Sequence, residues 1–191
     1  HYHDLGPKVK TLLKFTKLVS EGKITNYSLE KFNFEKEIDK KGKIDDVLSP
    51  NLTILAQIIK EPISTKGPRI SSELSFAGRF LVLIPFSNRI SISQKIKSKK
   101  ERDRLKKLIE ENRPKGFGVI IRTVAQGKKI AELEKDLQGL YNQWLKLCGK
   151  INGAKIPSRI LSELNRSSSI LRDLFDDQFK GIYCNNKELC Y

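Results

Sequence analysis

The chain of 191 residues is long enough for one domain with a sizeable hydrophobic core, or for one domain with parts of others. It has 37 lysines and arginines against 22 acidic residues, and this net charge of +15 points to a polyanionic partner, nucleic acid first. The 3 cysteines are too few and too irregularly spaced for a disulfide scaffold or a zinc site, and no apolar run approaches the ~20 residues of a membrane span, so we expect a cytoplasmic protein with reduced thiols.

The first half of the chain predicts one helix and several short strands. Residues 8–21 place apolar side chains at helical spacing, and Gly22 suits the position after a helix end. Residues 23–50 are polar and predict a mobile connection. Strands are expected at 52–60, at 69–76, over the apolar run 80–84 that follows Gly78, and at 90–96, where isoleucines alternate with polar residues.

The second half predicts helices that pack on the sheet. The expected elements are a charged helix over 98–113, a strand over 117–124, a long helix over 128–149, a capped helix after Ser167–Ser169, and a strand at 181–184. The apolar stripe of the long helix includes Trp144, and packing on the sheet is its simpler interpretation, with subunit packing as the alternative. The order of strands and helices indicates an α+β fold, a small mixed sheet with packed helices.

The positive charge is concentrated in the middle of the chain. Residues 61–123 carry 15 basic and 6 acidic side chains, so a polyanion would dock there; a lysine-rich surface that only confers solubility is the alternative. No catalytic constellation is visible. Both histidines lie at the start of the chain, and the neighbouring carboxylates at 45–46 and 176–177 would point apart, which disfavours a metal site.

One strand ends in residues that suit a phosphate. After the apolar Val119–Ile121 come Arg122, whose planar fork matches two phosphate oxygens, and Thr123, which adds a hydroxyl and a backbone N–H. Adjacent side chains of a strand face opposite ways, so the two share a ligand only if the strand ends there; Gly127 favours that ending. From these residues alone, a phosphate pocket and an ordinary surface strand end are equally good interpretations.

Two longer motifs resemble the ribonuclease E/G family of bacterial endoribonucleases. They are IKEPISTKGPRISSELSFAGRFLVLIP at residues 59–85 and GFGVIIRT at residues 116–123. The sequence departs from the family pattern with Phe76-Ala77-Gly78 in place of Leu-Ala-Gly and with Ile84 in place of the usual methionine. The resemblance covers residues 47–185 well and the first 46 residues poorly.

The resemblance implies a domain order. Residues 1–74 would be a partial S1 RNA-binding domain of the OB-fold type with an insertion, and its earlier barrel strands would be missing. Residues 75–150 would be the 5′-sensor domain, and residues 151–191 a linker and the start of an RNase H-like domain. The absence of methionine fits a piece cut from a longer protein. An incomplete barrel leaves exposed strand edges, so we expect residues 1–50 to be mobile, or to be ordered only by packing on neighbours.

The resemblance also implies the residues that bind RNA. Arg122 and Thr123 match the pair that grips a 5′-monophosphate, and Gly78 and Val82 match positions that contact the first nucleotide. Lys66 matches a lysine of the RNA channel. The implied partner is single-stranded RNA with a 5′-monophosphate.

The family's catalytic groups would lie beyond this chain. Its magnesium-binding aspartates and its Cys-Pro-x-Cys zinc ligands fall downstream of Tyr191, so we expect no cofactor here, and magnesium with structural zinc in the full-length protein. That protein would be an endoribonuclease of RNA processing and decay, and homo-oligomers are expected only for the full length. The alternative is a stand-alone RNA-binding or assembly module that recognises only backbone charge. Whether binding depends on the RNA 5′ end separates the two.

Overall fold

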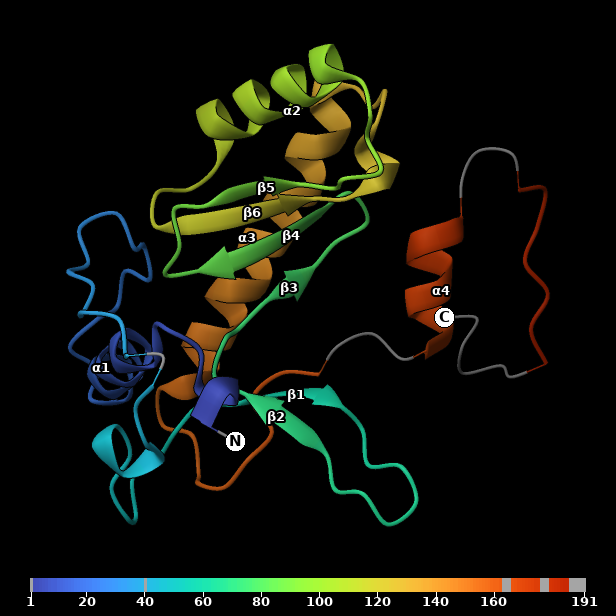
Figure 1. Cartoon of the computed structure of the whole chain (residues 1–191). Helices are drawn as coiled ribbons and strands as arrows, with labels where there is room; N and C mark the ends of the chain where they lie inside the picture. The colour runs from blue at the N-terminus through green and yellow to red at the C-terminus, as the bar shows by residue number, and fades with distance from the viewer. Residues whose placement is uncertain (1, 40, 163–165, 176–178, 186–191) are drawn as a thin grey trace. The chain divides into compact units, whose positions relative to one another are not determined.

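The structure, a computed structural model, describes residues 2–39, 41–162, 166–175 and 179–185 (Figure 1). The chain divides into two compact units, residues 1–161 and 162–191. In the second unit, helix α4 spans Arg166–Leu174, so Ser167–Ser169 lie inside the helix and not ahead of it as predicted. The strand expected at 181–184 is wrong, because these residues form irregular backbone. The acidic pair at 176–177 lies outside the described residues.

A four-stranded mixed sheet lies at the centre of the first unit, with strand order β3-β4-β6-β5 (Figure 1). Its strands are β3 (Phe76–Ala77), β4 (Leu81–Pro85), β5 (Ile90–Ile92) and β6 (Phe117–Ile121). Strand β4 runs antiparallel to both β3 and β6, while β5 runs parallel to β6. The predicted α+β class and the mixed sheet are thereby confirmed, although β5 and β6 end earlier than expected.

Three α-helices surround this sheet, close to their predicted positions. They are α1 (Val9–Ser20), α2 (Lys99–Asn112) and α3 (Ile130–Ile151). The Ser98 side chain caps α2 by accepting the N–H of Glu101 at 3.4 Å. Helix α3 packs on β3 and β4, α2 packs beside β5, and α1 packs on α3. No helix in the described part of the chain is long and apolar enough to cross a bilayer.

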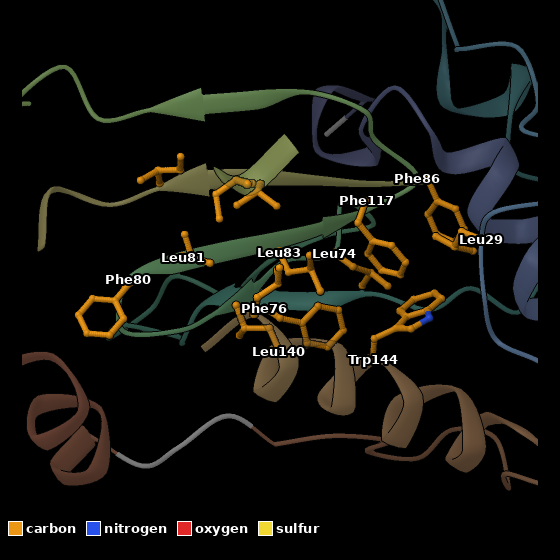
Figure 2. Close-up of a cluster of buried hydrophobic side chains, with 14 of the residues drawn as sticks. Leu29, Leu74, Phe76, Phe80, Leu81, Leu83, Phe86, Phe117, Leu140 and Trp144 are labelled. Carbon is orange, nitrogen blue, oxygen red and sulfur yellow. The ribbon is translucent and has the colours of Figure 1, made fainter. Parts of the chain in front are cut away.

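The core between α3 and the sheet is built around Trp144 (Figure 2). The Trp144 ring is fully buried, with ring centroids 5.2 Å from Phe15 of α1 and 5.5 Å from Phe117 of β6. Its Nε1 donates a hydrogen bond to the Tyr27 carbonyl at 2.9 Å. The apolar stripe of α3 therefore packs within its own chain, which favours the simpler of its two interpretations. Ile130, at the first turn, is 53% exposed and lies outside the core.

The segment expected to be a mobile connection is packed, although it is irregular. In residues 23–50 the only regular element among the described residues is the short 3-10 helix η2 (Ile44–Asp46). Leu29 is only 2% exposed and belongs to the core. The Thr11 hydroxyl accepts the N–H of Glu35 at 2.9 Å, and Glu30 pairs with Lys115 at 2.6 Å. The prediction of a mobile segment relied on its polar composition, but a few apolar residues such as Leu29 are buried and hold the segment in place.

A separate two-stranded hairpin precedes the main sheet. It pairs β1 (Gln57–Lys60) with β2 (Arg69–Ser71), and the 3-10 helix η1 (Tyr2–Leu5) lies against it through an Asp4–Arg69 ion pair of 2.8 Å. The described residues form no closed barrel, so the S1 assignment stays a prediction. Strand β1 is shorter than the strand expected at 52–60, because only residues 57–60 of that range pair with β2.

Candidate nucleic-acid interface

Strand β6 ends where the phosphate interpretation requires it to end. The last strand residue is Ile121, and its carbonyl accepts the N–H of Ser93 at 2.9 Å. Arg122 remains extended and donates its N–H to the Phe80 carbonyl at 2.8 Å, after which the chain turns into the 3-10 helix η3 (Thr123–Ala125). Because the chain turns after Arg122, strand alternation no longer separates the Arg122 and Thr123 side chains.

The Arg122 side chain lies against the turn between β3 and β4. Its Nη1 donates hydrogen bonds to the Gly78 carbonyl at 2.7 Å and to the Arg79 carbonyl at 3.2 Å. The side chain is half-buried. A guanidinium held by two carbonyls has a fixed plane, which an arginine at an ordinary surface strand end would lack.

Thr123 and Ser93 bring two hydroxyls beside this arginine. Their Oγ atoms are 2.8 Å apart and share a hydrogen bond. An open pocket of about 370 Å³ is lined by Ser93, Ile120, Ile121, Arg122, Thr123 and Val124. Ile120 is 38% exposed, so the pocket combines a cation and hydroxyls with an apolar wall. This combination suits a phosphate joined to a base or sugar.

Of the five residues predicted to bind RNA, Arg122 and Thr123 line the pocket, while Gly78 and Val82 contact residues of its lining. Gly78 closes the β3–β4 turn by donating its N–H to the Leu81 carbonyl at 2.8 Å, and Arg122 lies on that turn. Val82 pairs with Ile120 across β4 and β6, on the sheet face where both are partly exposed. Lys66 is exposed in the β1–β2 hairpin loop and does not line the pocket.

Sequence reasoning missed Asp136 of α3, which holds the same turn from the other side. Its carboxylate accepts the N–H groups of Arg79 at 3.1 Å, Phe80 at 2.9 Å and Leu81 at 2.9 Å. A Cβ on Gly78 would lie 2.6 Å from both carboxylate oxygens. Gly78 was expected to contact the first nucleotide, but the nearest atoms that a side chain at this position would meet belong to Asp136. No local pattern links this aspartate to a turn 55 residues away.

Basic side chains flank the pocket. The Phe80 ring lies under both Arg79 and Lys128, whose charged groups are 5.4 Å and 5.5 Å from its centroid. Beyond Ser93, the segment before α2 and the first turn of that helix expose four lysines that have no acidic partner in the described part of the chain: Lys95, Lys97, Lys99 and Lys100. The charge surplus read from the sequence thus includes a cluster that follows the pocket directly.

Glu101 ties α2 to the loop that follows η3. Its carboxylate binds the Arg104 guanidinium through two contacts of 2.7 Å and accepts the Gly127 N–H at 2.8 Å. Arg104 also donates to the Lys128 carbonyl at 3.2 Å. The Arg104 hydrogen bond, aided by the Gly127 N–H, lowers the pKa of Glu101 to about 2. The hydrogen bonds of Glu101 and Arg104 to Gly127 and Lys128 hold in place the loop that follows η3.

We expect Glu101→Gln to lower the free energy of unfolding at pH 7 by about 1–2 kcal/mol, after allowance for the partial exposure of Arg104. The pKa of Glu101 is lowered in the folded state, so its contribution is complete above the ordinary carboxyl pKa of about 4.3 and is lost as the pH falls toward 2. Urea unfolding at pH 7, 4 and 3 measures the difference. Glu134→Gln, at an exposed position of α3, is the control. A difference that is constant with pH would contradict this account.

No metal centre can be built from the described residues. Within residues 2–39, 41–162, 166–175 and 179–185, no three His, Cys, Asp or Glu side chains gather in a way that could hold a metal ion. Buried Cys148 is no ligand candidate, because desolvation raises the pKa of its thiol far above the usual range.

Comparison with known proteins places this site in a family. The sequence profile of the Ribonuclease E/G family matches residues 75–191. Ribonuclease E of Nostoc sp. (strain PCC 7120) is 33% identical over 132 residues, which cover 69% of this chain and 19% of the relative. Ribonuclease G of Escherichia coli (strain K12) is 31% identical over 144 residues, 75% of this chain and 29% of the relative. Ribonuclease G of Haemophilus influenzae is 32% identical over 148 residues, which cover 78% of this chain and 30% of the relative. The chain spans less than a third of the length of these relatives.

Proposed function

Because the chain belongs to the Ribonuclease E/G family, we propose that it recognises the 5′-monophosphate end of single-stranded RNA on behalf of an endoribonuclease. The observation that carries the proposal is the end of β6, where Arg122 and Thr123 lie beside an open pocket with an apolar wall. In this proposal residues 75–150 are the 5′ sensor.

Each pocket residue has a role in the proposal. Arg122 supplies charge-assisted hydrogen bonds to the terminal phosphate, and Thr123 supplies its hydroxyl. Ile120 and Val82 offer an apolar wall to the first base, on the sheet face that the helices leave open. The turn at Gly78 orients Arg122 through its carbonyl.

The rest of the chain contributes affinity that ignores the 5′ end. The lysines at 95–100, and Lys66 on the hairpin as an RNA-channel contact, neutralise backbone phosphates, so their contribution falls with rising salt. Cleavage in the cytoplasm would be performed by magnesium-binding groups outside these residues, in a full-length protein that also holds structural zinc and forms homo-oligomers. Accordingly, this chain by itself should bind RNA without cutting it.

We expect the chain to prefer a 5′-monophosphorylated RNA over its 5′-hydroxyl counterpart by about 1–2 kcal/mol, near tenfold. Water screens the two charge-assisted hydrogen bonds of Arg122, which is why the preference is modest. The measurement is a binding competition between the two oligomers. Arg122→Ala combined with Thr123→Val should abolish the preference.

Lys97→Ala is the matched control, because it also removes a positive charge and should weaken the binding of both oligomers equally. Equal affinities in the native chain would rule out the 5′-sensor proposal and favour the stand-alone module that reads backbone charge. A double variant that keeps the preference would exclude Arg122 and Thr123 as its source. Magnesium-dependent cleavage of an AU-rich single strand by the purified chain would show that catalytic groups are present after all.

A further inference from the structure

The β3–β4 turn is held by opposite charges on its two sides. Its carbonyl groups at Gly78 and Arg79 accept hydrogen bonds from the Arg122 guanidinium. Its N–H groups at residues 79–81 donate to the Asp136 carboxylate. The peptide dipoles of the turn therefore lie between an anion from α3 and a cation from the end of β6.

Only a carboxylate fits the position of Asp136. Its Oδ2 accepts two N–H groups, from Phe80 and Leu81, and its Oδ1 accepts the third, from Arg79. An asparagine has one acceptor oxygen, and its amide N–H groups would face at least one of these backbone donors. A longer glutamate at position 136 would crowd the Gly78 backbone, because the Asp136 carboxylate oxygens already lie only 2.6 Å from where a Cβ on Gly78 would be. The absence of a side chain at Gly78 thus leaves the space that the Asp136 carboxylate occupies.

We propose that Asp136 is the positioning residue of the 5′-end pocket. Its carboxylate fixes the turn, and the fixed carbonyls of the turn hold the Arg122 guanidinium in the plane that receives the phosphate. Asp136 touches no RNA in this arrangement and acts only through the turn. The inference rests on the proposed function, because the pocket must bind a 5′ phosphate for its orientation to matter.

A purely structural aspartate would give a different result from a positioning one. Loss of a structural contact lowers the stability of the chain and weakens the binding of 5′-monophosphate and 5′-hydroxyl RNA alike. Loss of the positioning contact misaligns Arg122, so it weakens the phosphorylated RNA selectively. The ratio of affinities for 5′-monophosphate and 5′-hydroxyl oligomers separates the two roles, and a global loss of folded protein cannot imitate a change in that ratio.

The test measures this ratio for the native chain, Asp136→Asn and Asp136→Ala, with Glu134→Ala as a control on an exposed face of the same helix. We expect the near-tenfold native ratio to fall to about threefold in Asp136→Asn and below about twofold in Asp136→Ala. The affinity for the 5′-hydroxyl oligomer should stay within about twofold of native. Asp136→Asn has almost the native shape, so it gives an answer even where the alanine variant does not fold.

The same substitution in an Arg122→Ala background completes the design. If Asp136 acts through Arg122, Asp136→Asn should cause no further change in the ratio there, because the two residues form one coupled unit. A native chain without any preference overturns the proposed function and this inference together. A native preference that Asp136→Asn leaves intact overturns this inference alone, as would an equal loss of affinity for both oligomers.

Discussion

Replacement of Trp144 by alanine is expected to lower the free energy of unfolding by about 3–5 kcal/mol. The indole is fully buried and meets aromatic rings from three separate segments, with centroid distances of 5.2 Å to Phe15, 5.7 Å to Phe86 and 5.5 Å to Phe117. The substitution opens a cavity among these rings and leaves the Tyr27 carbonyl without its 2.9 Å donor. Equilibrium urea unfolding followed by circular dichroism measures the loss.

Two other variants test the cause of this loss. Trp144→Phe keeps much of the ring packing but removes the Nε1 donor, so it should cost clearly less than the alanine variant. Gln143→Ala, at the neighbouring exposed position of α3, should change stability by no more than about 0.5 kcal/mol. A Trp144→Ala loss below 1 kcal/mol would mean that α1 and the sheet do not share one core.

Gly118→Ala is expected to destabilise the chain by about 2–3 kcal/mol, because a new methyl group would be forced into occupied space. The sheet order places β5 on the far side of β6 from β4, so the connection between β4 and β5 must pass the start of β6. A Cβ on Gly118 would lie 2.6 Å from the Ser87 Oγ and 2.8 Å from the Arg89 carbonyl oxygen of that connection. Thermal and urea unfolding measure the effect.

Gly139→Ala provides the opposite control. Gly139 lies on an exposed face of α3 and a Cβ there would meet nothing within 4 Å, so alanine should raise stability by about 0.5–1 kcal/mol through its better helix propensity. In the Gly118→Ala background, Ser87→Gly should recover part of the loss, since the Arg89 carbonyl remains close. A neutral Gly118→Ala would indicate that the connection does not pass over β6 at this point.

Long periodic patterns predicted their elements well. The apolar stripe of α3 gave the helix to within two residues at each end, because each buried position repeats one face of a 3.6-residue period. Strand ends were less predictable. Strand β5 ends at Ile92 because a turn follows it directly, in which the Ile96 N–H donates to the Ser93 carbonyl. The alternation of apolar and polar residues continues through this turn, so the sequence pattern does not mark the end of the strand.

The pocket could be predicted only in part. Arg122 and Thr123 are adjacent in sequence, and their chemistry suits a phosphate, although an ordinary strand end was an equally good interpretation of these residues alone. Asp136 could not be found this way, because its partners are backbone N–H groups, which carry no sequence signal. The structure gives a reason for both Gly116 and Gly118: Gly116 has a φ of +83°, and a Cβ on Gly118 would meet the connection between β4 and β5.

The contacts of Trp144 with Phe15 and Tyr27 also bear on how this protein evolves. Similarity to the family profile begins at residue 75, yet the aromatic core is completed by α1 and the segment after it. A substitution that enlarges one side of this core must therefore be matched on the other side. Residues 75–150 transplanted from a relative would arrive with an α3 shaped for another neighbour. The first residue that the family profile matches is therefore not the border of the packed core.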